Sequence, residues 1–176
     1  MKKEPKRKID LLIIHCSATP EDTKLTEQDL EAIHRMRGAD GAGYHFYIRK
    51  NGDIKSMRPI GEIGAHTKGF NEHSIGICYE GGLDNKGNPK DTRTEWQKHS
   101  LRVLVKTLLL DYPGARVCGH RDLMGIETKE THLFTVENEY FVKSCPSFDV
   151  RSDMKYIPDN YHYSYSGNKA AYVAMV

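Results

Sequence analysis

The sequence lacks paired cysteines, long apolar runs and any strong excess of one charge. Its four cysteines are far apart and form no CxxC pair, which excludes a zinc ribbon or a thioredoxin-like redox motif. No apolar run approaches the roughly 20 residues that span a bilayer. The net charge is only +2 over 176 residues, and we find neither internal repeats nor low-complexity blocks. These absences leave a single globular domain, long enough to bury a core.

Basic residues gather at the start of the chain, before the first apolar stretch. A secretory signal would continue with an apolar core of about 7 to 15 residues and a cleavage site of small residues. Here the apolar stretch covers only residues 11–14, follows Asp10 and runs directly into His15. We therefore expect residues 1–8 to be a solvated basic tail, with no signal peptide and no oxidising environment for the cysteines.

Short runs of branched apolar residues predict buried strands in three places. The dipeptide Asn51-Gly52 lies between two strand-like segments, and it predicts a β-hairpin because both residues tolerate a positive φ. The buried strands and the hairpin are expected at 9–15, 74–79, 115–118 and 44–57.

Two capping boxes predict where helices begin. Thr26 and Thr94 each place a hydroxyl ahead of an apolar face, with an acidic or amide side chain three residues later. The first helix is expected over 26–37, the second is longer, and a final helix is expected near Asp149. Strands that alternate with helices, together with the hairpin, predict one α/β domain with a central mixed β-sheet flanked by about three helices.

Three residues with metal-binding side chains stand at the ends of predicted elements. His15 ends the first strand, His120 follows the last strand, and Cys145 precedes a proline where the chain turns into a helix. A catalytic zinc takes three nitrogen, sulfur or oxygen ligands from the protein and keeps a fourth position open for water. Ligands at the ends of adjacent strands can converge on one rim of a sheet, so these three residues are candidates for such a site.

Each candidate also has a simpler interpretation that spacing alone leaves open. A histidine after an apolar strand is commonly a hydrogen-bonded core residue, and a free cysteine is often an inert buried thiol. Nine histidines also allow many accidental triples. Cys16 neighbours His15 and faces the other side of the strand, so we expect it in the core, as we do Cys78 and Cys118.

Five segments carry the most specific signal in the sequence. They are HCSAT from His15, GYHF from Gly43, GAHTKGFNEHSIGI from Gly64, GGLDNKG from Gly81 and KSCPSFD from Lys143. In order and spacing they resemble N-acetylmuramoyl-L-alanine amidases of the phage-lysozyme type, in a superfamily that includes the peptidoglycan recognition proteins. Several ordered motifs are much more specific than any single one. The resemblance covers about residues 9–150.

The resemblance implies a peptidoglycan-amidase-like fold and a Zn²⁺ ion bound by His15, His120 and Cys145. Such an ion polarises the scissile carbonyl and lowers the pKa of a bound water toward about 7. The resemblance also implies that Tyr44 and Lys143 are catalytic. We expect Lys143 to meet the negative charge of the transition state, and Tyr44 to orient the water or the carbonyl or to relay a proton.

The resemblance further implies that His66 lines the peptide groove and binds substrate, with Asn71 close behind it. The simpler interpretations stay open here as well. Tyr44 is also compatible with a strand aromatic that packs with Phe46 and Ile48, and a lysine is most often a solvated charge.

One feature departs from the phage-type pattern. In those relatives the second histidine and the cysteine are close in sequence, whereas here residues 123–142 lie between them. Asp122 is therefore a rival third ligand, because a carboxylate replaces the cysteine in some superfamily members. We favour Cys145, since Lys143 and the CPSFD segment accompany it. We expect the insert to be a lid or a groove wall.

Residues 9–158 are thus expected to form a zinc amidase domain, with a C-terminal tail at 159–176. The leading hypothesis is zinc-dependent hydrolysis of the amide between N-acetylmuramic acid and L-alanine in peptidoglycan. The alternatives are a non-catalytic muropeptide-binding module, which usually lacks the zinc cysteine, and a structural zinc domain, which needs a fourth protein ligand. We expect a monomer without nucleic-acid partners or a membrane segment, cytoplasmic until released, that acts on the bacterial cell wall.

Overall fold

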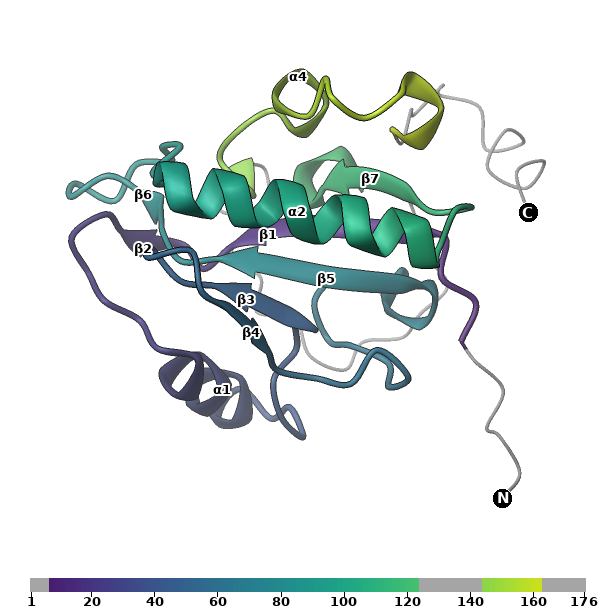
Figure 1. Ribbon diagram of the computed structural model, residues 1–176. Coiled ribbons are helices and arrows are strands. Elements are labelled where there is room, and N and C mark those ends of the chain that lie inside the picture. Colours follow the sequence, from purple (N-terminus) through teal and green to yellow (C-terminus); the bar gives the residue numbers. More distant parts are fainter. Residues whose placement is uncertain (1–6, 124–143, 163–176) are drawn as a thin grey trace.

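The centre of the computed structural model, which describes residues 7–123 and 144–162, is a five-stranded mixed β-sheet (Figure 1). Its strands are β1 (Leu11–Cys16), β3 (Phe46–Ile48), β4 (Ile54–Ser56), β5 (Ser74–Tyr79) and β7 (Arg116–Gly119). Their order is β4-β3-β5-β1-β7, with only the edge strand β4 antiparallel to its neighbour. A smaller parallel pair consists of β2 (Thr19–Pro20) and β6 (Gly82–Leu83).

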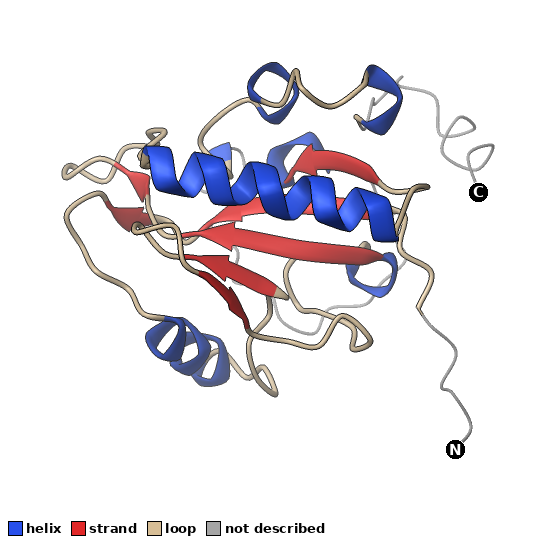
Figure 2. Ribbon diagram, viewed as in Figure 1, coloured by secondary structure: helices blue, strands red, loops and turns tan. Residues whose placement is uncertain are grey.

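Three α-helices lie within the described part of the chain, and α2 crosses one face of the sheet (Figure 2). The helices are α1 (Glu27–Met36), α2 (Glu95–Asp111) and α4 (Val150–Asp153), and the 3₁₀ turns are η1 (Asn71–His73), η2 (His120–Leu123) and η3 (Asp159–Tyr161). Both predicted capping boxes are present, at Thr26 and Thr94, and Asp149 caps α4. No described helix has the length and apolar character needed to cross a membrane.

The α/β architecture and the mixed sheet are confirmed, with element ends shifted by one or a few residues. The hairpin forms as β3 and β4, and Gly52 in its turn has φ +88°. Gly52 therefore occupies the left-handed region that glycine adopts without a steric penalty. The shifts at the element ends are expected, because the terminal residues of a helix or strand gain fewer hydrogen bonds than its central ones.

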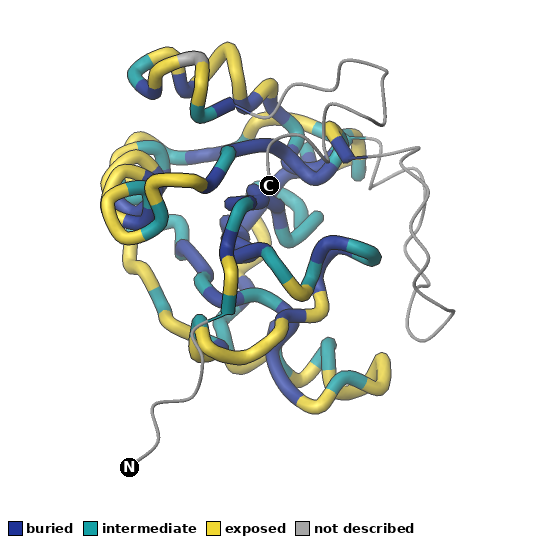
Figure 3. The backbone as a smooth tube through the Cα atoms, turned by 90° about the vertical axis from the view of Figure 1, so that its right-hand side faces the viewer, coloured by how far each residue is buried: buried dark blue, intermediate teal, exposed yellow. Residues whose placement is uncertain are grey.

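The two faces of β1 have different partners, which decides where a site can form. Leu12 and Ile14 belong to the main apolar cluster, together with Leu101 and Val105 of α2. The alternate residues Leu11 and Ile13 belong to a second cluster, and His15 shares their face of the strand. Figure 3 shows the buried segments running through the middle of the molecule. The face with His15 therefore points away from α2.

Arg7 contacts the loop that precedes β5. Its guanidinium donates hydrogen bonds to the carbonyl oxygens of Ile60 and Asn71, both at 2.9 Å, and of Ser74 at 3.1 Å. These bonds join the start of the chain to both ends of the segment 60–74. Because buried carbonyl groups need partners, Arg7 stabilises the path of this loop on the face opposite to α2.

Replacing Thr94 with alanine is expected to lower the free energy of unfolding by about 1–2 kcal/mol. Its Oγ1 accepts from the backbone N–H of Gln97 at 3.1 Å and donates to the carbonyl of Lys50 at 2.6 Å, so the variant loses a cap and a tie to the hairpin. Urea unfolding of the metal-free protein measures the loss. Thr107→Ala, on the exposed side of the same helix, is the control and should change stability by less than about 0.5 kcal/mol. Equal stabilities of the two variants would contradict the prediction.

Candidate metal centre

Three side chains meet at the carboxyl ends of the parallel strands. His15 is the fifth residue of β1, His120 directly follows β7, and Cys145 lies in the segment before α4. One ligand atom of each lies within 4.8 Å of the others, and all three residues are buried. The structure thus brings together the three residues that the sequence predicted as ligands, although 105 to 130 residues of chain separate His15 from the other two.

The pairing of β1 with β7 places the two histidines side by side. Ile14 is paired with Gly119 in the parallel register, so the residue that follows each of them, His15 or His120, lies at the same rim. The ring centroids of His15 and His120 are 4.7 Å apart. Parallel strands end at the same edge of a sheet, which is why two sequence-distant histidines meet there.

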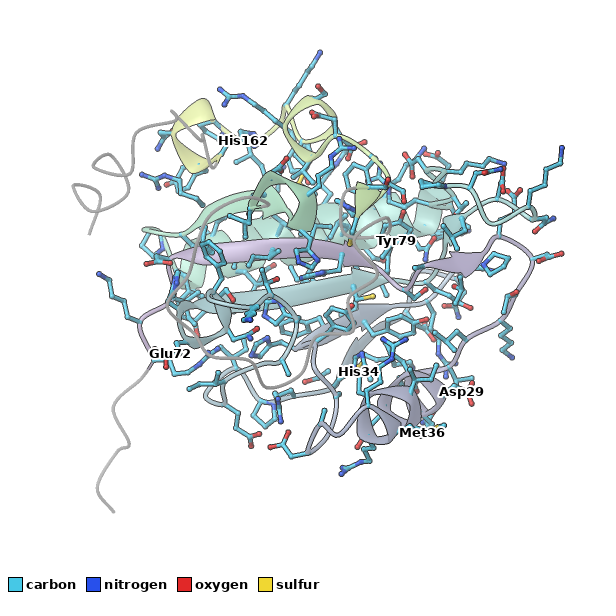
Figure 4. The ribbon with its side chains drawn as sticks, turned by 180° about the vertical axis from the view of Figure 1, so that it is seen from behind. Asp29, His34, Met36, Glu72, Tyr79 and His162 are labelled. Carbon is cyan, nitrogen blue, oxygen red and sulfur yellow. The ribbon has the colours of Figure 1, made fainter. Side chains whose placement is uncertain are left out.

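Cys145 and the proline that follows it are held at this rim by three hydrogen bonds. The backbone N–H of Cys16 donates to the Cys145 Sγ at 3.4 Å, and the N–H of Arg121 donates to the Cys145 carbonyl at 2.9 Å. The hydroxyl of Tyr79, labelled in Figure 4, donates to the carbonyl of Pro146 at 2.6 Å. The segment after the insert is therefore tied to the ends of β1, β5 and β7.

A buried arginine stabilises the chain just beyond Cys145. The guanidinium of Arg93 lies 3.3 Å from the centre of the Phe148 ring and bonds the carboxylates of Asp91 at 2.8 Å and Asp153 at 2.9 Å. A buried guanidinium is stable only when its charge is paired, and here two carboxylates and an aromatic face supply the partners. Phe148, and with it the segment that carries Cys145, is thereby fixed against the loop before α2.

Asp122, the rival ligand, has a different partner. Its Oδ2 accepts a hydrogen bond from the backbone N–H of Gly119 at 2.7 Å, and burial raises its pKa. Asp122 is not part of the ligand cluster found among the described residues, whereas Cys145 is. The geometry therefore favours the cysteine as the third member of the site.

The charge states of the three residues suit a divalent metal. Burial lowers the pKa of His15 well below its usual value and that of His120 to about 4, so both rings are neutral and offer a lone pair at neutral pH. Burial raises the pKa of the Cys145 thiol, so the thiol would lose its proton to solvent only when a bound cation stabilises the thiolate. Cys145 Sγ lies 3.8 Å from His15 Nδ1, close to the roughly 3.5 Å expected between sulfur and nitrogen ligands of one zinc.

Tyr44 lies directly beside this cluster. Its half-buried ring precedes β3, with its centroid 4.9 Å from that of His15 and 5.2 Å from that of His34. Tyr44 packs against the cluster of Leu25, Leu30, Tyr47 and Cys78, while Phe46 packs against the apolar cluster on the other face. The structure therefore places Tyr44 at the candidate site, as a catalytic residue requires, and its role stays a prediction.

The other predicted site residues have different outcomes. His66 is buried behind His15, and the side chain of Asn71 accepts hydrogen bonds from the loop backbone, so their contact with substrate stays a prediction. Lys143 and almost all of the insert lie outside the described residues.

Sequence reasoning missed His34, whose Nδ1 accepts from the N–H of Gly43 at 2.8 Å beside Tyr44. Its position on α1, labelled in Figure 4, has no motif signal of its own.

The mixed α/β sheet that carries this rim is a fold that the chain shares with solved amidases and with peptidoglycan recognition proteins. A family model for N-acetylmuramoyl-L-alanine amidase matches residues 5–132. The chain belongs to this N-acetylmuramoyl-L-alanine amidase family. Because this match ends before Cys145, the geometry supports Cys145 as a candidate ligand independently of the family model.

Relatives and solved structures agree with this membership. The chain is 34% identical to the endolysin of Escherichia phage T7 over 81% of this chain and 83% of that protein, and 34% identical to the endolysin of Klebsiella phage KP32 over 80% and 82%. The amidase LysC from Clostridium intestinale is similar with a TM-score of 0.58 and 31% identity over 70% of this chain and 78% of that one. Drosophila PGRP-LB shares the fold, with a TM-score of 0.65 and 21% identity over 93% and 87%.

The buried histidines predict a loss of stability in mild acid. Burial lowers the pKa of His45 to about 4. In the unfolded chain this imidazole is protonated below about pH 6.5, whereas in the folded chain it stays neutral until about pH 4. The free energy of unfolding should therefore fall as the pH drops from about 6.5 toward 4. His45→Gln cannot take up this proton, and its stability should fall less over that range, by up to roughly 3 kcal/mol. Parallel pH profiles from urea unfolding of metal-free proteins would contradict this.

Proposed function

We propose that this chain is a zinc-dependent amidase that hydrolyses the amide between N-acetylmuramic acid and L-alanine in the peptidoglycan of bacterial cell walls. Family membership supports the reaction class and the substrate. The single observation that carries the zinc assignment is the convergence of His15, His120 and Cys145 within 4.8 Å. Residues 9–158, which include all these residues, are proposed as the amidase domain.

The donor set and the burial of the site support zinc rather than a harder cation. Two neutral imidazoles and a thiol are ligands for borderline-soft metals, and carboxylate or carbonyl oxygens would be expected for magnesium or calcium. When bound, zinc would supply a Lewis acid for the scissile carbonyl and would acidify a water molecule at its open position. Within the described part of the chain the cluster has three members, which leaves such a position open.

The chain's own residues would orient the substrate and meet the developing charge. Tyr44 is half-buried beside His15, so its hydroxyl is proposed to orient the scissile carbonyl or to pass a proton. Lys143 precedes Cys145 by two residues, and its ammonium is proposed to stabilise the negative charge of the transition state. The N–H of Cys16, at 3.4 Å from the Cys145 Sγ, would stabilise a thiolate there.

Two other functions fit this chain less well. A muropeptide-binding module without catalysis would not need a cysteine beside two histidines, yet Cys145 lies at the rim with both. A purely structural zinc site is closed by four protein ligands, whereas three are found among the described residues.

Digestion of purified peptidoglycan is expected to release free stem peptides that begin with L-alanine. Mass spectrometry of the soluble products identifies the bond that is cut, because an amidase leaves intact glycan strands without peptides. A chelator should abolish the release, and added zinc should restore it. Binding to peptidoglycan without any released peptide would instead support the binding module.

Cys145→Ser is expected to weaken zinc binding by more than the roughly 100-fold that loss of an outer hydrogen-bond partner can cost. A serine hydroxyl is a far poorer zinc ligand than a thiolate, and amidase activity should fall with the bound metal. Zinc content after dialysis and competition with a chromophoric chelator measure the effect. Cys118→Ser is the matched control, because Cys118 is equally buried on β7 but is not in the cluster. Unchanged zinc content in Cys145→Ser would remove Cys145 from the site.

A further inference from the structure

A second buried histidine, His66, contacts His15 behind the ligand cluster. The Nδ1 of His66 lies 3.0 Å from the Nε2 of His15, and the two rings meet edge to face with centroids 5.1 Å apart. His66 is only 5% exposed, so little of its surface is open to a ligand. The other nitrogen of His15, Nδ1, is the one that faces Cys145 Sγ at 3.8 Å. His15 therefore points one nitrogen at the cluster and the other at His66.

The hydrogen bond between these rings requires one definite placement of protons. A neutral imidazole carries a proton on one nitrogen and a lone pair on the other. If His15 offers the Nδ1 lone pair to a metal, its proton must be on Nε2, and Nε2 can only donate. His66 must then accept with a bare Nδ1, and its own proton must be on Nε2. A metal-binding histidine commonly has an outer acceptor of this kind, usually a carboxylate or carbonyl.

The surroundings of His66 match this placement. Its Nε2 lies 3.3 Å from the Oγ of Ser74, a hydroxyl that can accept a hydrogen bond from the Nε2–H. The hydroxyl of Thr67 lies 3.2 Å from His66 Nδ1 and 3.4 Å from His15 Nε2, so it is a weaker, second partner for both rings. The order of donors therefore runs from His15 through His66 to Ser74.

The loop backbone and two glycines hold the His66 ring in this place. The side-chain oxygen of Asn71 accepts from the backbone N–H groups of His66 and Thr67, both at 2.9 Å. The ring packs where a side chain on Gly76 or Gly64 would stand, since a Cβ there would be 2.6 Å or 2.7 Å from its atoms. These contacts leave the ring little freedom to turn away from His15.

We propose that His66 is a positioning residue for the metal ligand His15: His66 Nδ1 accepts a hydrogen bond from the Nε2–H of His15, which keeps the Nδ1 of His15 turned to the metal. Asn71 supports this role by fixing the loop that carries His66. The inference rests on the proposed zinc function, and it gives both residues a task at the metal rather than at the peptide.

Zinc affinity of three variants tests the proposal. His66→Leu removes the acceptor and should weaken zinc binding by about 10–100-fold, measured by competition with a chromophoric chelator. His66→Gln offers a side-chain oxygen to His15 and should recover most of that loss. His45→Leu is the matched control: within the described part of the chain the fully buried side chain of His45 bonds Gly76, Glu62 and Arg7 and not His15, and its ring lies 5.7 Å from that of His66. This variant should therefore lose stability and keep its zinc affinity. The absorption bands of the Co²⁺-loaded proteins report the ligand geometry of each variant.

Unchanged affinity and Co²⁺ bands in His66→Leu would overturn the proposal, as would an equal loss of affinity in His45→Leu. If wild-type protein binds no zinc, the proposed function itself fails, which separates the two failures.

A second measurement uses only the wild-type protein, so it tests the proposal even if His66→Leu does not fold. Proton–nitrogen correlation spectra of the histidine rings in the zinc-loaded wild type should show His66 protonated on Nε2 and bare on Nδ1. A proton on His66 Nδ1 would overturn the proposal.

Discussion

The parallel pairing of β1 between β5 and β7 is the constraint on which the rest of the structure depends. It brings three strand ends to one edge, and the register that pairs Ile14 with Gly119 makes His15 and His120 neighbours at that edge. Alternation along β1 then points His15 away from α2, toward the face where the segment 60–74 lies. The fold thus decides both the rim and the face of the candidate metal centre.

Burial is the second determinant, because it gives each group at the rim its chemical character. Removing the imidazoles from water disfavours their charged forms, so His15, His66 and His120 are neutral hydrogen-bonding groups rather than cations. The same burial makes an unpaired Cys145 thiol hard to ionise, which couples its ionisation to the arrival of a metal. A site of this kind is stable without charge and becomes charged only on binding.

Sequence motifs and structure agree most closely where the motif residues are local in their effect. The capping boxes, the Asn51-Gly52 hairpin and the strand at 74–79 follow from neighbours within a few residues, and all of them form. His66 shows the limit of such reasoning. Its motif predicts a site residue, but the role proposed for it depends on a contact with His15, 51 residues away, that no local pattern contains.

The sequence by itself determined the elements, the family and the identity of the candidate ligands, because hydrophobic period, capping residues and ordered motifs are properties of short segments. The motifs already favoured Cys145 over Asp122 as the third ligand, and the tertiary structure supplies the geometric reason. Only there does the carboxylate of Asp122 accept from the N–H of Gly119. The Sγ of Cys145 instead accepts from the N–H of Cys16, which is 129 residues away in the sequence. Long-range contacts of this kind depend on how all the strands of the sheet pair, and they decide which ligand atoms lie close enough together to bind one metal ion.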